Sequence, residues 1–222
     1  MKLIKVGALL VLGVLLVAGA ALGLQLALLQ SPMPGPAVSL ASNPAPGARL
    51  TTIAEFPVGT FLEDLAVRDD GSMLITDLAK KQLWYMPAPT GAEEVQPLLL
   101  HTFDQPPFDI VETQKDLFYI DTASYLTSHE SFLQRVDLRG WHPGMPVPVQ
   151  SVLKFPFPIS AANGEAALSP NVILVADAMV GLIWRVDLSA DGMRASARVW
   201  LEHASMLPNP FTFFAQHKVQ PG

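Results

Sequence analysis

The sequence predicts an all-β fold built from repeated four-stranded units between residue 50 and the C-terminus. Three observations support this prediction. No segment after residue 50 keeps a helical period, short apolar runs alternate with turn residues, and one strand pattern recurs three times. Half of the 222 residues are hydrophobic and 15% are charged, so the chain has enough apolar material for one sizeable core.

Each repeat reads as a short strand, a polar turn, an apolar strand that ends in aspartate, and a third strand. The apolar strands end at Asp77, Asp121 and Asp177, which lie 44 and 56 residues apart. Fourth strands are expected at 96–102, 149–155 and 197–202. A propeller blade has four strands and about 40 to 50 residues. The repeat therefore predicts a β-propeller, with room for about four blades in residues 50–222.

A β-sandwich is the main alternative arrangement for strands of this length. It does not explain why an aspartate-ended strand recurs. Nor does it explain why the string Arg-Val-Asp-Leu follows two of these strands, at 135–138 and 185–188. A blade cannot bury both of its faces alone, so stacked blades account better for the repetition.

The N-terminal region differs from the repeats. Lys2 and Lys5 precede an uncharged stretch at 6–29, which is long enough to cross a bilayer as a helix. Small residues at 18 and 20 have the spacing of a signal-peptidase site, whereas the apolar run continues beyond them. We expect residues 1–30 to be a hydrophobic helix that acts as a signal peptide or membrane anchor. Residues 31–49 form a proline-rich linker, and the protein is then secreted or membrane-anchored.

Composition also excludes several classes of function. The formal net charge of -6 argues against nucleic acid as a partner, because an acidic surface repels phosphate groups. The chain has no cysteine, which excludes disulfides, thiolate zinc sites and cysteine nucleophiles. The five histidines lack metal-ligand spacing. No Gly-x-Ser-x-Gly motif or phosphate-binding glycine loop is present.

Two strings carry a family resemblance. Residues 61–76, FLEDLAVRDDGSMLIT, resemble the first-blade motif of the gluconolactonase/regucalcin-like six-bladed propellers, in particular their fungal branch. Asn163 and Gly164, followed by AALSP at 166–170 and VAD at 175–177, are similar to that family's Asn-Gly blade. The resemblance extends from about residue 52 to the C-terminus. Measured against six blades, the chain looks C-terminally truncated.

The resemblance implies a divalent cation, often calcium, in the central channel, with Glu63 and Asn163 as ligands. A hard cation prefers such oxygen donors. Glu63 is also a candidate general base, and Asp109 is a second candidate catalytic residue in the blade where the family often has Asn-Asp-Gly. The alternatives are a solvated carboxylate for Glu63 and an ordinary turn for Asn163. The recurring aspartates are interpreted as structural residues at strand ends.

Aromatic residues near the blade entrances predict an apolar pocket for a substrate. The candidates for this lining are Phe108, Phe155 and Phe157. The resemblance extends to fungal propellers that include hetero-Diels–Alderases, and an eroded ligand set with phenylalanines near the channel mouth favours such a cyclase, a small-molecule enzyme of secondary metabolism. A calcium-dependent lactone or ester hydrolase is the alternative enzyme. An inactive propeller fragment or binding module is the third hypothesis. The expected partners are a small-molecule substrate and, if the N-terminal segment stays uncleaved, a membrane.

Overall fold

The computed structural model describes residues 51–91, 94–124, 130–156, 162–177 and 180–206. All of these residues belong to one compact unit, Thr51–Gly222. The predictions for the N-terminal helix and the linker fall outside the described residues. Within the described ranges, no helical segment has the length and hydropathy needed to cross a bilayer.

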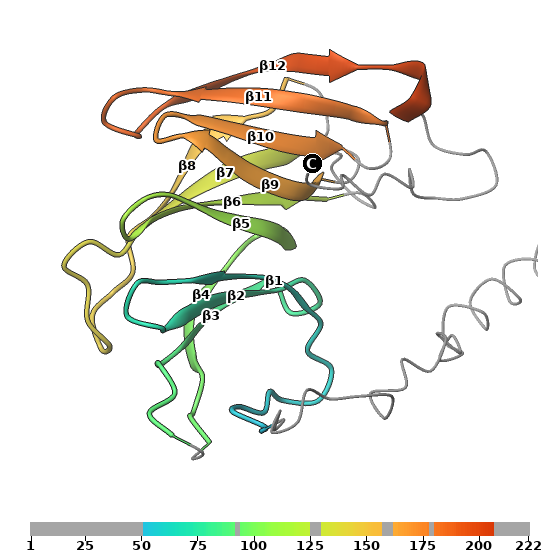
Figure 1. Ribbon diagram of the computed structural model, residues 1–222. Helices are drawn as coiled ribbons and strands as arrows, with labels where there is room; N and C mark the ends of the chain where they lie inside the picture. Colours follow the sequence, from blue (N-terminus) through green and yellow to red (C-terminus); the bar gives the residue numbers. More distant parts are fainter. Residues whose placement is uncertain (1–50, 92–93, 125–129, 157–161, 178–179, 207–222) are drawn as a thin grey trace, which may run out of the picture. The chain divides into compact units, whose positions relative to one another are not determined.

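The described residues contain twelve strands, which form three antiparallel four-stranded sheets with consecutive strands as neighbours (Figure 1). We call these sheets blades 1, 2 and 3. Blade 1 contains β1 (Leu62–Val67), β2 (Met73–Asp77), β3 (Gln82–Met86) and β4 (Leu98–Thr102). Blade 2 contains β5 (Pro107–Gln114), β6 (Leu117–Ala123), β7 (Ser131–Asp137) and β8 (Val149–Lys154). Blade 3 contains β9 (Ala162–Ser169), β10 (Val172–Asp177), β11 (Leu182–Leu188) and β12 (Ala195–Glu202), and a 3-10 helix, η1 (Ala204–Met206), follows.

The predicted all-β propeller class is confirmed, as are the fourth strands, which are β4, β8 and β12. The described residues form three blades, whereas chain length alone predicted about four. The three blades extend from Leu62, where β1 begins, to Glu202, where β12 ends, and residues 207–222 lie outside the described part of the chain.

Local sequence explains the tight turns between strands. The β1–β2 turn contains Gly71, which has φ 83°, a left-handed conformation that costs glycine little. The carboxylate of Asp70 accepts a hydrogen bond from the Ser72 amide at 2.9 Å and closes this turn. In blade 2 the corresponding turn uses Asp116 at φ 60°. Aspartate is one of the few side chains that tolerates this region.

Two hydrophobic clusters of described residues lie between the blades. One fills the space between blades 1 and 2, with Leu83 and Phe118 at its centre. The other joins blades 2 and 3 through Tyr119, Leu133 and Ile173. Strand β6 serves both clusters, because successive side chains of a strand point to opposite faces of the sheet. Each blade therefore depends on its neighbour for half of its core.

The pairing register corrects one feature of the repeat. Asp77 pairs with Leu62, and Asp177 pairs with Ala162 at the same place in blade 3. In blade 2 this place belongs to Thr122, which pairs with Pro107. Asp121 therefore lies one residue before the register position that Asp77 and Asp177 occupy in their blades. A shift of one residue turns a side chain to the opposite face of the sheet, so Asp121 does not share their environment.

Candidate functional site

The first strand of each blade carries the residues singled out by sequence. Strand β5 contacts both β1 and β9, so the three inner strands lie side by side. The register aligns two successive positions across them. The first position is occupied by Glu63, Phe108 and Asn163, and the second by Asp64, Asp109 and Gly164.

Glu63 and Asn163 come together in the structure. The side-chain amide of Asn163 donates a hydrogen bond to Glu63 Oε1 at 3.3 Å, although the residues belong to blades 1 and 3. Glu63 is half-buried and Asn163 is exposed. Burial, together with the negative charge of Asp64, raises the pKa of Glu63. The arrangement agrees with the prediction that both side chains point into one shared space.

Asp109 occupies a more enclosed position beside this pair. Its exposed fraction is 9%, and its Oδ2 accepts a hydrogen bond from the Gly164 amide at 2.7 Å. Burial raises the pKa of Asp109 to about 6, and the charges of Asp64 and Glu63 act in the same direction against the Gly164 hydrogen bond. A carboxyl with this pKa exchanges its proton near neutral pH, which is a property of general acids and bases.

Two further carboxyls lie behind Asp109, and sequence reasoning assigned neither of them to the site. Asp121 is 1% exposed, and its Oδ1 accepts a hydrogen bond from the Asp109 amide at 3.0 Å. Its Oδ2 and both side-chain oxygens of Glu165 are shielded from solvent and have no hydrogen-bond partner among the described residues. Burial raises the pKa of both groups. The charge of Asp109 adds to this effect at Asp121, and the charge of Asp121 does so at Glu165.

A sequence signal for Glu165 did exist. The register places Glu165 at the same position as Leu65 in blade 1 and Ile110 in blade 2. A carboxyl at a repeat position that is otherwise apolar is the kind of exception that marks a functional site. We refer to Glu63, Asp64, Asp109 and Glu165 on the inner strands, together with the adjacent Asp121 on β6, as the inner-strand carboxylate cluster.

Asp64 has a mainly structural place in this cluster. Its Oδ2 accepts a hydrogen bond from the Ile110 amide at 3.0 Å and so fastens β1 to β5. Thr76 on β2 accepts a hydrogen bond from the Asp64 amide at 3.0 Å, and its hydroxyl donates to the Phe108 carbonyl at 2.7 Å, which fastens β2 to β5. The Asp109–Gly164 hydrogen bond repeats the Asp64–Ile110 connection between β5 and β9.

The predicted aromatic pocket is only partly described. Phe108 and Phe155 are both 4% exposed. The Phe155 ring packs at 6.0 Å from the Trp184 ring, within the core between blades 2 and 3. Phe157 lies outside the described residues. The Phe155 ring thus contributes to packing between blades 2 and 3, and a role of Phe108 or Phe155 in binding substrate stays a prediction.

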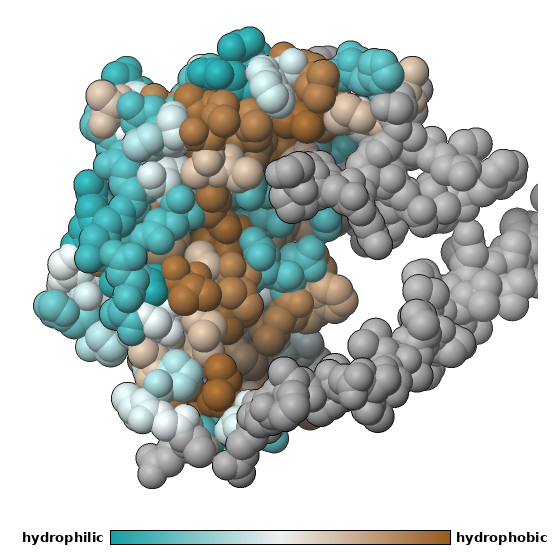
Figure 2. Space-filling model, in the orientation of Figure 1, coloured by the Kyte–Doolittle hydropathy of each residue, from teal (hydrophilic) through white to brown (hydrophobic). Residues whose placement is uncertain are grey.

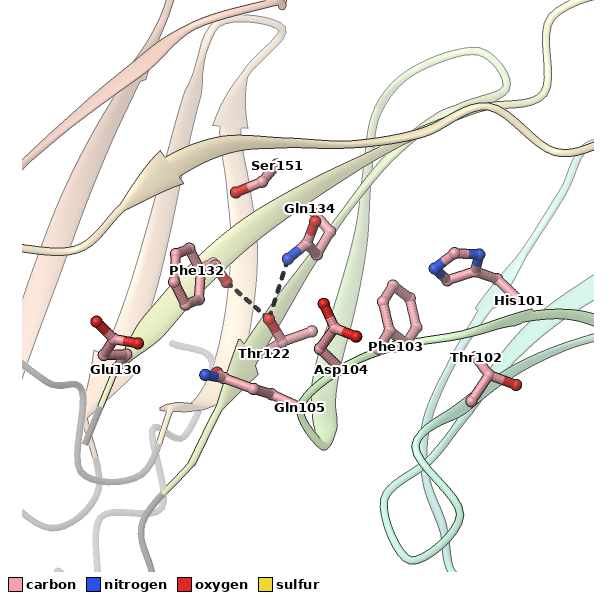
Figure 3. A pocket seen from close by; sticks show the side chains of 10 residues that line it. All are labelled: His101, Thr102, Phe103, Asp104, Gln105, Thr122, Glu130, Phe132, Gln134 and Ser151. Atoms are coloured by element: carbon pink, nitrogen blue, oxygen red, sulfur yellow. Dashed lines mark hydrogen bonds between the residues drawn. The ribbon is translucent and has the colours of Figure 1, made fainter. Parts of the chain in front are cut away.

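A separate cavity of about 450 Å³ lies near the outer strands (Figure 3). In Figure 3 the Gln134 amide points to the Thr122 hydroxyl, with a hydrogen bond of 3.2 Å between them. The lining is largely polar and contains none of the residues that sequence reasoning selected. Its residues are His101, Thr102, Phe103, Asp104, Gln105, Thr122, Glu130, Phe132, Gln134 and Ser151.

The calcium prediction needs more ligands than the described residues supply. Calcium takes six to eight oxygen ligands, and Glu63 with Asn163 would provide two. Asn163 moreover presents its NH₂ group to Glu63. In the part of the chain that the structure describes, no three His, Cys, Asp or Glu side chains are grouped so as to hold a metal ion. These residues alone do not fit a calcium site, and we derive no chemical step from calcium.

Comparison with known proteins yields fold likeness only. No protein-family model and no curated protein sequence matches the chain. One similar solved structure is titled a nidogen/laminin complex, with 13% identity, a TM-score of 0.48, and coverage of 68% of this chain and 52% of that chain. Another is a putative 6-phosphogluconolactonase from Bacteroides uniformis ATCC 8492, with 10% identity, a TM-score of 0.46, and coverage of 68% and 45%. The chain spans about half the length of these structures, and likenesses at this level carry no information on function.

Proposed function

We propose that the inner-strand carboxylate cluster performs acid–base catalysis on a small molecule, with hydrolysis of a lactone or ester as the reaction. The observation that carries this proposal is the environment of Asp109. Its carboxyl is buried, its Oδ2 is fixed by the Gly164 amide, and its pKa is raised to about 6. Such a group is deprotonated at neutral pH yet basic enough to accept a proton from water.

The reaction uses two groups in turn. Asp109 removes a proton from a water molecule, whose oxygen attacks the carbonyl carbon of the substrate. The Asn163 amide, which donates to Glu63 Oε1 at 3.3 Å in the structure, donates instead to the developing oxyanion. When the carbon–oxygen bond to the leaving group breaks, protonated Asp109 returns its proton to the departing alkoxide. The products are a carboxylic acid and an alcohol, or a single hydroxy acid from a lactone.

The cyclase predicted from sequence requires an apolar pocket for two reacting groups. The described phenylalanines that were expected to line it, Phe108 and Phe155, are buried, and Phe155 belongs to the core between blades 2 and 3. Buried carboxyls beside a half-buried Glu63 favour proton transfer instead. For this reason we prefer the hydrolase to the cyclase.

The test is an assay with a panel of aryl esters and γ- and δ-lactones. Asp109→Asn should lower kcat/KM by about 10²- to 10⁴-fold, the usual contribution of general acid–base catalysis. Activity of the unmodified protein should rise with an apparent pKa near 6 and persist in EDTA. Asp191→Asn, in an exposed turn of blade 3, is the matched control and should leave activity unchanged. Absence of hydrolysis across the panel would contradict the proposal and favour a binding module.

The site of action is a second part of the proposal. The hydrophobic stretch at 6–29 supports entry into the secretory pathway, with cleavage after residue 20 or retention as an anchor. N-terminal sequencing of the mature protein distinguishes these outcomes. A protein that retains Met1 and fractionates with soluble cytoplasmic proteins would contradict both.

A further inference from the structure

Blade 3 carries an apolar face that no described residue covers. We call the face of a blade that is turned toward the next blade in the chain its forward face, and the other its backward face. On blade 3 the forward face contains Leu174, Ile183 and Leu201, because Leu174 alternates with buried Ile173 and Ile183 pairs with Leu201. Leu174 and Ile183 are half-buried, and Leu201 is 43% exposed. Figure 2 shows hydrophobic residues gathered on the exposed surface of this blade.

The other blades show how this face is normally used. Ile183 has the register position of Leu83 in blade 1 and Leu133 in blade 2. Both leucines are 0% exposed, because the backward face of the next blade covers them. The positions of Leu174 and Ile183 are therefore completely buried in blades 1 and 2, where Leu74, Leu83, Tyr119 and Leu133 are each 0% exposed.

Blade 1 presents the complementary surface. Leu65 pairs with Ile75 on its backward face and is 51% exposed, whereas Ile110, at the same position of blade 2, is 5% exposed. Val67 is 53% exposed on the same face. Each copy thus offers the forward face of blade 3 and the part of the blade 1 backward face around Leu65 and Val67, whereas Ile75 and Met86 on that backward face are 5% and 3% exposed.

We propose that a second copy of this chain occupies these faces, with blade 1 of each copy packed head to tail on blade 3 of the other. The contact continues the interface that already joins blades 1 and 2 and blades 2 and 3. Propellers usually have four to eight blades. The described residues of two copies give six blades, whereas those of one copy give three and those of three copies give nine. A head-to-tail contact that closes on itself forms a ring with no open blade.

The residue that follows the outer strand of each blade also supports a second copy as the occupant, because it is phenylalanine in blades 1 and 2 but not in blade 3. Phe103 follows the outer strand of blade 1, and Phe155 follows that of blade 2, where its ring packs on Trp184 of blade 3. The residue at this place after blade 3 is His203. On the backward face of blade 1, a phenylalanine from the preceding segment of the same chain takes this place, because the ring of Phe56 packs at 5.6 Å from the Trp84 ring.

Trp84 and Trp184 occupy equivalent register positions. A partner that packs blade 1 on blade 3 therefore brings the missing ring with it, as Phe56.

The closing contact also has suitable chemistry at the inner strands. Ala176 has the position of Thr76 in blade 1, and Leu65 has that of Ile110 in blade 2. Ring closure places Ala176 against Leu65 of the second copy, which is an apolar pair with no buried charge. The second copy also brings a second carboxylate cluster to the same channel. The contact does not depend on the reaction proposed above.

The absence of cysteine allows a direct test by site-specific crosslinking of the full chain. We would prepare Ala176→Cys and Leu65→Cys chains separately and treat them with a short bis-maleimide. The mixture of the two variants should give a crosslinked dimer, and each variant alone should give none. His142→Cys, in an exposed loop of blade 2, replaces Leu65→Cys in the control mixture and should give none.

Each other outcome overturns the proposal. A dimer from Ala176→Cys alone would show that two blade 3 faces meet each other. No crosslink in the mixture would show that another segment covers the face, or that copies associate only through the hydrophobic N-terminus. Light scattering adds a second readout. Leu201→Asp should reduce the mass from two copies to one, whereas Met145→Asp, at a 49% exposed residue of blade 2, should leave two copies.

Discussion

The two interfaces between blades share a backbone arrangement but differ in chemistry. Between blades 1 and 2, the register positions that meet near the inner strands hold Thr76 and Ile110. Between blades 2 and 3, the same positions hold Asp121 and Glu165. The first interface shows that a hydroxyl and an apolar side chain satisfy the fold. The equivalent contact between blades therefore forms without a pair of carboxyls in the first interface.

The difference has an energetic consequence. A buried polar group without a partner costs about 1 to 3 kcal/mol. Asp121 Oδ2 and the Glu165 oxygens are such groups among the described residues. A chain that keeps them, although its own first interface offers a less costly alternative, is expected to use them for function. The following predictions test this comparison, from the largest expected effect to the smallest.

The apolar parts of the two interfaces should contribute equally. Leu83 and Leu133 occupy equivalent positions and are both 0% exposed. Replacing either leucine with alanine should lower the free energy of unfolding by about 2 to 5 kcal/mol, because a cavity remains in a packed core. Chemical denaturation measures both values. If only one of the two substitutions destabilised the protein, the blades would not be equivalent packing units.

The free energy of unfolding should depend on pH because of the buried carboxyls near the second interface. The pKa of Asp109 is raised to about 6 in the folded state, above the 3.8 of an unperturbed aspartate. The folded protein then binds the proton more tightly than the unfolded chain. The contribution of Asp109 to the free energy of unfolding is fully present below about pH 4. It is lost as the pH rises to about 6, by up to about 3 kcal/mol. Denaturation at several pH values should show a larger loss in the unmodified protein than in Asp109→Asn, in which the buried Asp121 and Glu165, whose pKa values are also raised, still contribute. Identical profiles would contradict the burial argument.

Glu165 and Ile110 occupy the same register position, and replacing each with the other's residue should change the free energy of unfolding in opposite directions. Glu165→Ile copies the residue of blade 2 and should raise the free energy of unfolding at pH 7 by about 1 to 3 kcal/mol, because it removes buried oxygens without partners. Ile110→Glu should lower it. A destabilised Glu165→Ile protein would show that the Glu165 carboxyl is satisfied by a group outside the described residues.

The ion pair that crosses the first interface should have the smallest effect. Arg68 Nη2 lies 2.8 Å from Asp116 Oδ1, with 10% and 18% of the two side chains exposed. Arg68→Ala should cost about 1 kcal/mol or somewhat more, because the pair is partly shielded from water. Arg185 pairs with Asp187 within blade 3 at greater exposure, so Arg185→Ala should cost less. Thermal unfolding of both variants checks this order.

The sequence was sufficient to predict the blades because their signals are local. Strand alternation, turn residues and the recurrence of a strand ending near Asp77 and Asp177 depend only on neighbours along the chain. The same recurrence misplaced Asp121 by one residue. Nothing in a short apolar run fixes which residue pairs with the neighbouring strand, and a single step reverses the face.

The candidate site was predictable only in part. Glu63, Asn163 and Asp109 were identified from motifs, and the structure brings their strands together. The participation of Glu165 depends on contacts with blade 2 across 44 residues of sequence, from Asp121 onward. Burial of this kind follows from packing between blades, which no local pattern encodes.

The pKa of Asp109 is the quantity on which the proposed site depends most directly. A titration of its side-chain carboxyl carbon by NMR, with Asp109→Asn to assign the signal, measures it without any knowledge of the substrate. We expect a midpoint near pH 6, as burial and the neighbouring carboxylates require. A midpoint near 3.8 would show a solvated carboxylate and would contradict acid–base catalysis at the inner strands.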